Sequence, residues 1–350
     1  MGRLTAIVGP RPPAPFCTWL LQHGPAASTS LFVIDVGCRG GPPDWVRVWP
    51  GDIRGVGIDP DRVEIERLCA EARWPGISWV PGWAGHPAGA DGLPSGMDRA
   101  TWRALNLGTW RRTSSAVAQR VLAEEVPPGD PGQQTEPPPM VSVDELCVGS
   151  PRVDLLKVDT DGHDLEVLES APATLDRALA VAVEVQLQGQ AHPRASNFAN
   201  IDRLLRSAGF ELFDLRVHRH SRAGLPAPFW GRGGAPTHGG QTVWGDAVYF
   251  RDVIASPWRG LQDRGWMLAA LFELAGLPDC AVELVQAGLV PGADERAVAA
   301  LRRGWWRDGG TRALRWLSAR PGMLRLGGDG RLWERLTRIP AAVLWHPWRA

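Results

Sequence analysis

The first stretch with chemical potential is Leu31–Gly41 (LFVIDVGCRGG), where an apolar run leads into an acid, Asp35, and then into three glycines. This pattern is typical of a buried parallel strand that feeds a tight turn. Glycine has no Cβ, so Gly37, Gly40 and Gly41 would let the backbone approach a ligand closely. The same pattern also fits an ordinary strand-to-helix turn that binds nothing.

A second apolar stretch, Gly55–Pro60 (GVGIDP), ends in another acid, Asp59. In a doubly wound sheet, an acid at the tip of the second strand holds the hydroxyls of a ribose. The two stretches together predict a half-domain that binds a nucleoside, and this makes the turn without a ligand the weaker interpretation.

The spacing of the glycines bears on which nucleoside binds. A dinucleotide fingerprint has the form GxGxxG, and here Cys38 and Arg39 replace its middle glycine. That glycine admits a pyrophosphate, so its absence disfavours NAD and suits a nucleoside without phosphates. S-adenosylmethionine is such a ligand, and we expect the backbone from Gly37 through Cys38 to Gly40 to hold its amino-acid tail.

Two further residues complete this expected cofactor site. Asp35 can lie behind the glycine turn and order its N–H groups. Trp83 follows the third predicted strand, where folds of this kind contact the adenine ring, although a tryptophan there fits core packing equally well.

A third stretch, Leu155–Ala171 (LLKVDTDGHDLEVLESA), places acids at the carboxyl end of a strand, where α/β sheets place their sites. Asp159, or His163 as the local group that titrates near neutrality, could accept a proton from a hydroxyl. Alternatively, Asp159 and Asp161, with Asp164 nearby, could hold a divalent cation such as Mg²⁺ that acidifies the hydroxyl. Acids here could also simply stabilise the start of the next helix.

Glu184 is an acid inside the apolar strand predicted over 178–187. An unpaired charge in such a strand is costly. Glu184 therefore either lines the site, as a further candidate for the catalytic base, or pairs with a buried partner.

Here the chain resembles the FkbM family of S-adenosylmethionine-dependent methyltransferases. That family has a strand ending in Lys-Ile-Asp-Val-Glu-Gly-x-Glu and then a helix with a Val-Leu pair; this sequence has KVDTDGHD and then EVL over 157–168, with Asp at both family Glu positions. Further similar pieces are VIDVGCRGG, GIDPD, the Ser114-Ser115 pair, VSVDEL, VEVQ and FANIDRLLRSAGFEL. The resemblance covers about 30–252 and departs most over 86–140.

The resemblance implies a class I methyltransferase fold, S-adenosylmethionine as cofactor, and methylation of a hydroxyl on a sugar, glycan or secondary metabolite. Two other functions stay open. One is an NAD(P)-dependent oxidoreductase of similar architecture, and the other is a scaffold protein that binds S-adenosylmethionine without catalysis.

The alternation of strands and helices predicts an α/β, Rossmann-like sheet that is mostly parallel, with an antiparallel last strand. We expect strands over 31–36, 53–58, 77–80, 99–107, 153–158, 178–187, 210–218 and 246–251, and helices over 16–23, 42–49, 61–72, 113–125, 142–146, 164–171, 201–208, 268–275 and 281–287. The chain then divides into an N-terminal lead (1–30), a methyltransferase domain (31–252) and a helical region rich in Arg and Trp (253–350).

Composition excludes several classes of function. The formal net charge is zero, so no global field favours nucleic acid. We find no stretch long enough to span a bilayer and no convincing signal peptide, and the five scattered cysteines fit reduced thiols. We therefore expect a cytoplasmic enzyme with a small-molecule or glycan acceptor. In its C-terminal region we expect Arg on a solvated face and Trp in a small helical core; contact of these residues with a membrane surface, a glycan or nucleic acid is the alternative.

Overall fold

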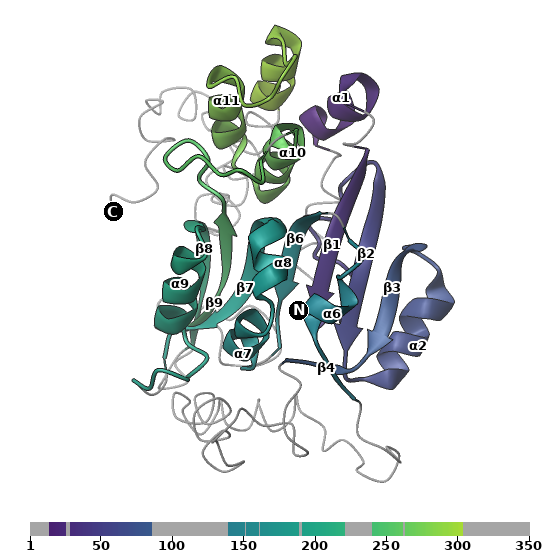
Figure 1. Ribbon diagram of the computed structural model, residues 1–350, viewed down its shortest axis with the longest axis vertical. Coiled ribbons are helices and arrows are strands. Elements are labelled where there is room, and N and C mark those ends of the chain that lie inside the picture. Colours follow the sequence, from purple (N-terminus) through teal and green to yellow (C-terminus); the bar gives the residue numbers. More distant parts are fainter. Residues whose placement is uncertain are drawn as a thin grey trace, which may run out of the picture.

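A computed structural model describes residues 14–25, 29–85, 139–150, 152–160, 162–188, 191–220, 240–261 and 263–303. It shows a central sheet with helices on both faces and a further group of helices at one end (Figure 1). Short apolar strands followed by amphipathic helices build this architecture because each helix buries one stripe against the sheet.

The sheet has seven strands in the order β3-β2-β1-β6-β7-β9-β8. Their bounds are β1 Ser30–Val36, β2 Asp52–Asp59, β3 Gly76–Pro81, β6 Val153–Val158, β7 Ala178–Gln186, β8 Glu211–His220 and β9 Gln241–Phe250. All neighbours are parallel except β9, which runs antiparallel to both β7 and β8. The predicted Rossmann-like sheet with an antiparallel last strand is therefore confirmed. A second, two-stranded sheet joins β4 (Trp83–Ala84) to β5 (Met140–Val141).

One face of the sheet is covered by four helices: α6 (Val143–Leu146), α7 (Asp164–Glu169), α8 (Pro172–Arg177) and α9 (Phe198–Ser207). They bury apolar side chains against the alternate residues of β1, β6 and β7, such as Ile34, Leu156 and Val181. The helices form where caps allow it: Ser142 accepts from the N–H of Glu145, and Asn197 accepts from the N–H of Asn200.

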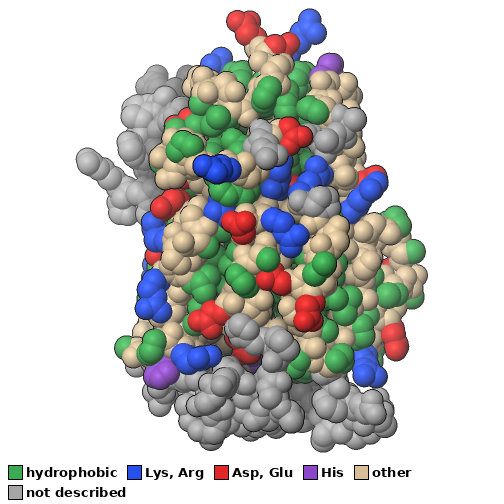
Figure 2. Space-filling model, viewed as in Figure 1, with side chains coloured by type: hydrophobic (Ala, Val, Ile, Leu, Met, Phe, Trp, Pro, Cys, Tyr) green, Lys and Arg blue, Asp and Glu red, His purple; other side chains and the backbone are tan. Residues whose placement is uncertain are grey.

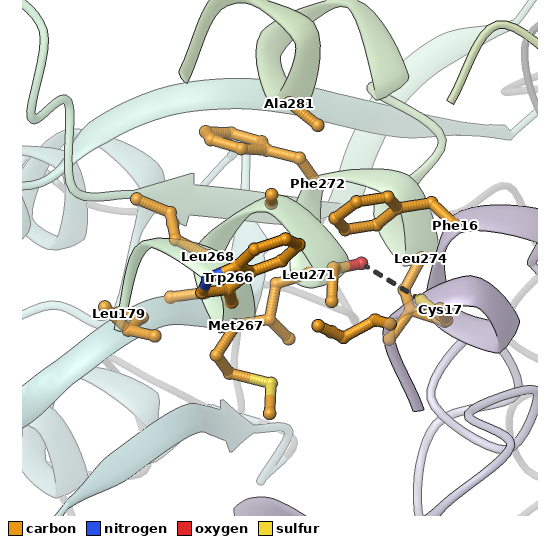
Figure 3. Close-up of a cluster of buried hydrophobic side chains, with 14 of the residues drawn as sticks. Phe16, Cys17, Leu179, Trp266, Met267, Leu268, Leu271, Phe272, Leu274 and Ala281 are labelled. Carbon is orange, nitrogen blue, oxygen red and sulfur yellow. Dashed lines mark hydrogen bonds between the residues drawn. The ribbon is translucent and has the colours of Figure 1, made fainter. Parts of the chain in front are cut away.

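On the opposite face, α2 (Arg62–Glu71) packs against β2 and β3, and α10 (Gly265–Ala275) packs against β7. Beyond the end of the sheet, α1 (Pro15–His23) and α11 (Pro278–Gln286) pack against α10 (Figure 1). Figure 3 shows Phe16 of α1 near Trp266 and Phe272 of α10. The rings of Phe16 and Trp266 stack with centroids 6.2 Å apart. Leu155 of β6 and Ala180 of β7 belong to the same buried cluster.

The helices on both sides of the proposed boundary at residue 253 thus share one core with the sheet. Arg264, just before α10, adds an ion pair to the buried Asp154 at the start of β6, with 3.1 Å between Nη2 and Oδ1. The division of the chain at 253 remains a proposal about its sequence organisation.

The helix expected over 42–49 is wrong, because that segment forms a series of turns, with Val46 and Trp49 buried beneath α1. The single helix expected over 164–171 is two helices, α7 and α8, because Pro172 starts a new one. β9 begins five residues earlier than expected, at Gln241. The elements expected over 99–107 and 113–125 lie outside the described residues, as does the C-terminal stretch from 304 onward.

On the face seen in Figure 2, acidic and basic side chains of the described residues are interspersed, in keeping with the zero net charge. Within the ranges that the structure describes, no helix has the length and hydrophobicity needed to cross a bilayer.

Candidate functional site

The glycine turn after β1 lies at the carboxyl edge of the sheet, next to the ends of β2 and β6. Gly37, Gly40 and Gly41 have φ angles of 74°, 80° and 81°. These left-handed conformations favour glycine. At Gly37 a Cβ would also collide with the carbonyl of Asp159, so the turn and the end of β6 pack backbone against backbone.

The N–H groups of this turn already have protein acceptors. Those of Gly37 and Cys38 donate to the Ile58 carbonyl at 2.9 and 3.2 Å, and that of Gly40 donates to Glu64 Oε1 at 2.7 Å. The turn is therefore held in shape by β2 and α2. The proposal that the glycine turn holds the amino-acid tail of a cofactor therefore rests on the fixed shape of the turn, and not on backbone N–H groups that lack an acceptor.

The side chain of Cys38 is fully buried and packs with Ile65, Leu68, Trp74 and Trp79. Burial raises the pKa of its thiol well above the ordinary value. Any contact of Cys38 with a cofactor would therefore use its backbone.

Asp35 is buried and pairs with Lys157 of β6, with 3.1 Å between Nζ and Oδ1. Lys157 also donates to the Gly37 carbonyl at 2.5 Å and lies 3.5 Å from Asp159 Oδ2. Asp35 therefore orders the turn through Lys157, and not by accepting from its N–H groups as the sequence suggested. Burial raises the pKa of Asp35 to about 6, an effect that the Lys157 ammonium opposes.

Asp59 ends β2 and is only 7% exposed. Its Oδ1 accepts from the N–H of Asp61 at 2.9 Å, and burial raises its pKa. Among the described residues this is the one hydrogen bond of the Asp59 carboxylate, so a pair of ribose hydroxyls would relieve its desolvation. A Cβ at Gly40 would meet Arg47 Nη2 at 3.9 Å, an ordinary contact distance. The buried carboxylate of Asp59, at the tip of the second strand, fits the ribose of S-adenosylmethionine.

Trp83 lies two residues beyond β3, and the N–H of the intervening Gly82 donates to the Asp59 carbonyl at 3.0 Å. The indole is 41% exposed, so it is not a core residue. Its ring faces His163, with centroids 5.6 Å apart. Burial lowers the pKa of His163 to about 4, which leaves the imidazole neutral at pH 7 but makes it a weak base.

The acids after β6 differ in what they contact. Asp164 is buried and accepts from Thr160 N and Oγ1, from Gly162 N and from Ser196 Oγ, so it fixes the turn before α7. Burial raises its pKa to about 6. Asp159 is half exposed at the edge of the sheet. Asp161 lies outside the described residues.

No cluster of three potential metal ligands occurs among the residues that the structure describes. A divalent cation between Asp159 and Asp161 stays a proposal.

Glu184 lies near the end of β7 and is 7% exposed. Val158 pairs with Val183, so the next residues along the two parallel strands, Asp159 and Glu184, are neighbours at the carboxyl edge. The structure thus places Asp35, Lys157, Asp159 and Glu184 along one face of three adjacent strands.

Three site residues were missed by sequence reasoning. Lys157 stood in the quoted family motif, but nothing in the sequence showed that it would hold the glycine turn. Glu64 fixes Gly40, and only the packing of α2 against the turn brings it there. Glu166 of α7 is 9% exposed, and the Oε1 atom has no hydrogen-bond partner among the described residues; burial raises its pKa to about 7.

This sheet order, with a glycine turn after the first strand and an acid at the tip of the second, defines a Rossmann-like methyltransferase fold. The family model of the methyltransferase FkbM domain matches residues 96–212 and confirms the resemblance that the sequence suggested. The fold and the family match together indicate that the protein is an S-adenosylmethionine-dependent methyltransferase.

Among solved structures, the chain is similar to a TehB-like SAM-dependent methyltransferase from Corynebacterium glutamicum, with 14% identity, a TM-score of 0.28, and coverage of 71% of this chain and 94% of that one. It is also similar to the N-methyltransferase NodS from Bradyrhizobium japonicum, with 12% identity, a TM-score of 0.30, and coverage of 68% and 97%. A third is magnesium protoporphyrin IX methyltransferase from Synechocystis with bound SAM, with 14% identity, a TM-score of 0.27, and coverage of 66% and 75%.

At these scores none of the three likenesses carries an argument about substrate. No curated protein matches the chain.

Proposed function

We propose that this protein transfers a methyl group from S-adenosylmethionine to a hydroxyl of a sugar, glycan or secondary metabolite. The observation that carries the proposal is the pair of neighbouring carboxylates, Asp159 and Glu184, at the carboxyl edge of β6 and β7. A hydroxyl is a poor nucleophile until its proton has an acceptor, and a positioned carboxylate can serve as one.

Each residue then has a proposed part. Asp59 binds the ribose hydroxyls, Trp83 lies against the base, and the turn from Gly37 to Gly40, which Lys157 and Glu64 hold, accommodates the amino-acid tail. When bound, S-adenosylmethionine supplies a methyl group that its sulfonium has already activated. What remains for the protein is alignment of the acceptor and removal of its proton.

Asp159 and Glu184 are the proposed proton acceptors, and His163 is a further candidate. Burial lowers the pKa of His163 to about 4, so its imidazole is no stronger a base than an ordinary carboxylate. The side chain of Asp159 is half exposed, so it can reach a bound acceptor. A cation held by Asp159 and Asp161 would be an alternative way to acidify the hydroxyl.

The first test is calorimetric titration of S-adenosylmethionine and S-adenosylhomocysteine into the wild type, with NAD as a negative control. We expect micromolar binding of both, and its loss in Asp59→Ala, because the ribose loses a buried carboxylate partner. Asp52→Ala is the matched control, since this acid begins the same strand and its side chain is exposed. No binding to the wild type would contradict the methyltransferase assignment.

A transfer assay with tritiated S-adenosylmethionine then tests the acceptor. Hydroxyl, amine and carboxyl compounds are compared, and we expect label on hydroxyl compounds. Binding of the cofactor without transfer to any of them would favour the non-catalytic scaffold. Loss of transfer in chelator, with recovery on adding Mg²⁺, would establish the cation.

A further inference from the structure

Next to the carboxylates of Asp159 and Glu184, a group of polar side chains lies across the adjacent strands β7, β9 and β8. Glu184 pairs in register with Asp246, and Gln186 pairs with Trp244. On the next strand, His218 pairs with Trp244. Alternate residues of a strand share a face, so these side chains lie on the same face of the sheet as Ala182. Ala182 pairs with Lys157 of β6, so this is also the face of Lys157.

We call Gln186, His218, Trp244 and Asp246 the lateral patch. It begins where the apolar cover of this face ends, because Ala180 and Ala182 pack in the core beneath α10 whereas the positions nearer the carboxyl edge are polar.

His218 in the lateral patch has a fixed orientation. Its imidazole stacks on the indole of Trp244, with ring centroids 3.5 Å apart and an angle of 11° between the planes. Its Nε2 lies 3.1 Å from Asp246 Oδ2. Asp246 is about half exposed and His218 is about a quarter exposed, so both polar groups can meet a ligand from solvent.

Gln186 is the member of the lateral patch that points to a ligand. It is 3% exposed, and its Nε2 atom has no hydrogen-bond partner among the described residues. A buried amide that makes no hydrogen bond destabilises the fold, and an apolar residue in its place would not. Its presence on a strand that is apolar apart from Glu184 is explained if a bound molecule supplies the acceptor.

The chemistry of the lateral patch selects the kind of molecule. It offers an amide donor, an imidazole nitrogen and a carboxylate within two strand spacings, about 10 Å. A hydroxyl both donates and accepts, so it can bond to any of the three groups. A molecule with a single hydroxyl would use Asp159 and Glu184 and leave the lateral patch unbonded.

We propose that the lateral patch recognises the non-reacting hydroxyls of a polyhydroxylated, sugar-like acceptor while one further hydroxyl lies at Asp159 and Glu184. This rests on the proposed O-methyltransferase function. It narrows the acceptor from a sugar, glycan or secondary metabolite to a sugar-like molecule whose other hydroxyls bind to the lateral patch.

The test compares methyl glycosides of glucose, mannose, galactose and rhamnose with cyclohexylmethanol, which has one hydroxyl on a ring of similar size. Transfer of tritiated methyl is measured in the wild type, Gln186→Leu and His218→Phe. We expect transfer to at least one glycoside, and kcat/KM for it to fall roughly tenfold in each variant, because each loses one hydrogen bond. The phenyl ring introduced by His218→Phe would keep the stack on Trp244 while removing the bond to Asp246.

Two further readouts separate recognition from folding. Affinity for S-adenosylhomocysteine should be unchanged in both variants, and the Tm of Gln186→Leu should equal or exceed that of the wild type. Asp214→Asn, an exposed acid on β8 outside the lateral patch, is the matched control and should keep full transfer.

The contrary outcomes are distinct. Equal transfer to cyclohexylmethanol and the glycosides, or unchanged kcat/KM in Gln186→Leu, would overturn the inference and leave the O-methyltransferase function standing. A lower Tm in Gln186→Leu would show a structural role and would also overturn the inference. Binding of S-adenosylhomocysteine without transfer to any hydroxyl compound would contradict the proposed function and the inference with it.

Discussion

Lys157 is the residue that holds the glycine turn after β1 in place. Its ammonium contacts the buried Asp35, the half-exposed Asp159 and the carbonyl of Gly37, so one cation joins the ends of β1 and β6. Burial alone would lower the pKa of Lys157, but the carboxylates of Asp35 and Asp159 outweigh it and the pKa is raised. The amine therefore stays charged at neutral pH.

We expect Lys157→Met to lower the free energy of unfolding by roughly 3–5 kcal/mol, because it leaves the Asp35 carboxylate buried without a partner. Urea denaturation measures this. The double variant Asp35→Asn with Lys157→Met should recover part of the loss, since the buried charge is gone. Arg54→Met, which breaks an exposed pair with Asp52, should change little. A fully stable Lys157→Met would show that Asp35 does not depend on the lysine.

At the residue scale, the sequence predicted the kinds of side chain at the site better than their partners. Asp59 at the tip of the second strand could be predicted, because strand position and residue type suffice. The partnership of Asp35 with Lys157 could not, because it depends on the register of β1 against β6, two strands that are far apart in the sequence.

At the element scale, helix α1 begins without a side-chain cap of its own, because Ala14 stands at the N-cap position. Glu273 of α10 supplies one from a distance: its Oε1 and Oε2 accept from the N–H groups of Phe16 and Cys17 at 3.0 and 2.9 Å. A carboxylate at a helix N-terminus is favoured by the helix dipole. Burial raises the pKa of Glu273, so this cap is made by a carboxylate largely removed from water.

We expect Glu273→Ala to lower the free energy of unfolding by roughly 2–3 kcal/mol, because two buried N–H groups lose a charged acceptor. Hydrogen exchange should quicken at the amides of Phe16 and Cys17 before it quickens in the sheet. Glu283→Ala, in the exposed face of α11, serves as the control and should leave both quantities unchanged. Unaltered protection of Phe16 in Glu273→Ala would show that apolar packing alone holds α1.

Most helices and strands could be predicted from apolar periodicity, glycine stops and caps; α2, for example, starts where Asp61 accepts from two N–H groups. The 42–49 segment could not. Two prolines and an acid are typical of a helix start, but burial of Val46 and Trp49 under α1 holds this segment in turns. That packing joins segments far apart in sequence, which local patterns do not show.

At the scale of the whole molecule, three buried acids, Asp35, Asp164 and Glu166, share a direction of response to pH. Burial raises the pKa values of Asp35 and Asp164 to about 6 and that of Glu166 to about 7. Each of these groups holds its proton to higher pH when folded than when unfolded. Their contributions to stability are therefore present in acid and are lost as pH rises.

Glu166→Gln isolates one of these contributions. The unfolded carboxyl loses its proton near its ordinary value of 4.5 and the folded one near 7, so the wild type should lose roughly 3 kcal/mol across that interval through Glu166. The free energy of unfolding of Glu166→Gln, relative to that of the wild type, should therefore be higher at pH 8 than at pH 5. Urea denaturation at both pH values measures this, with Glu283→Gln, at an exposed position of α11, as the control. A constant difference between wild type and Glu166→Gln would show that Glu166 titrates normally.

The cap that Glu273 provides for α1 also constrains the order of events during synthesis. Phe16 and its acceptor are 257 positions apart, so the N-terminal helix lacks this cap until most of the chain has been made. At roughly 5–20 residues per second, that interval is about 10–50 s. During this time the apolar side chains of Leu31 and Val33, which are buried in the folded protein, are not yet covered by α10. The nascent chain therefore exposes aggregation-prone surface on the ribosome, and its yield in the cell should depend on chaperones as much as on its final stability.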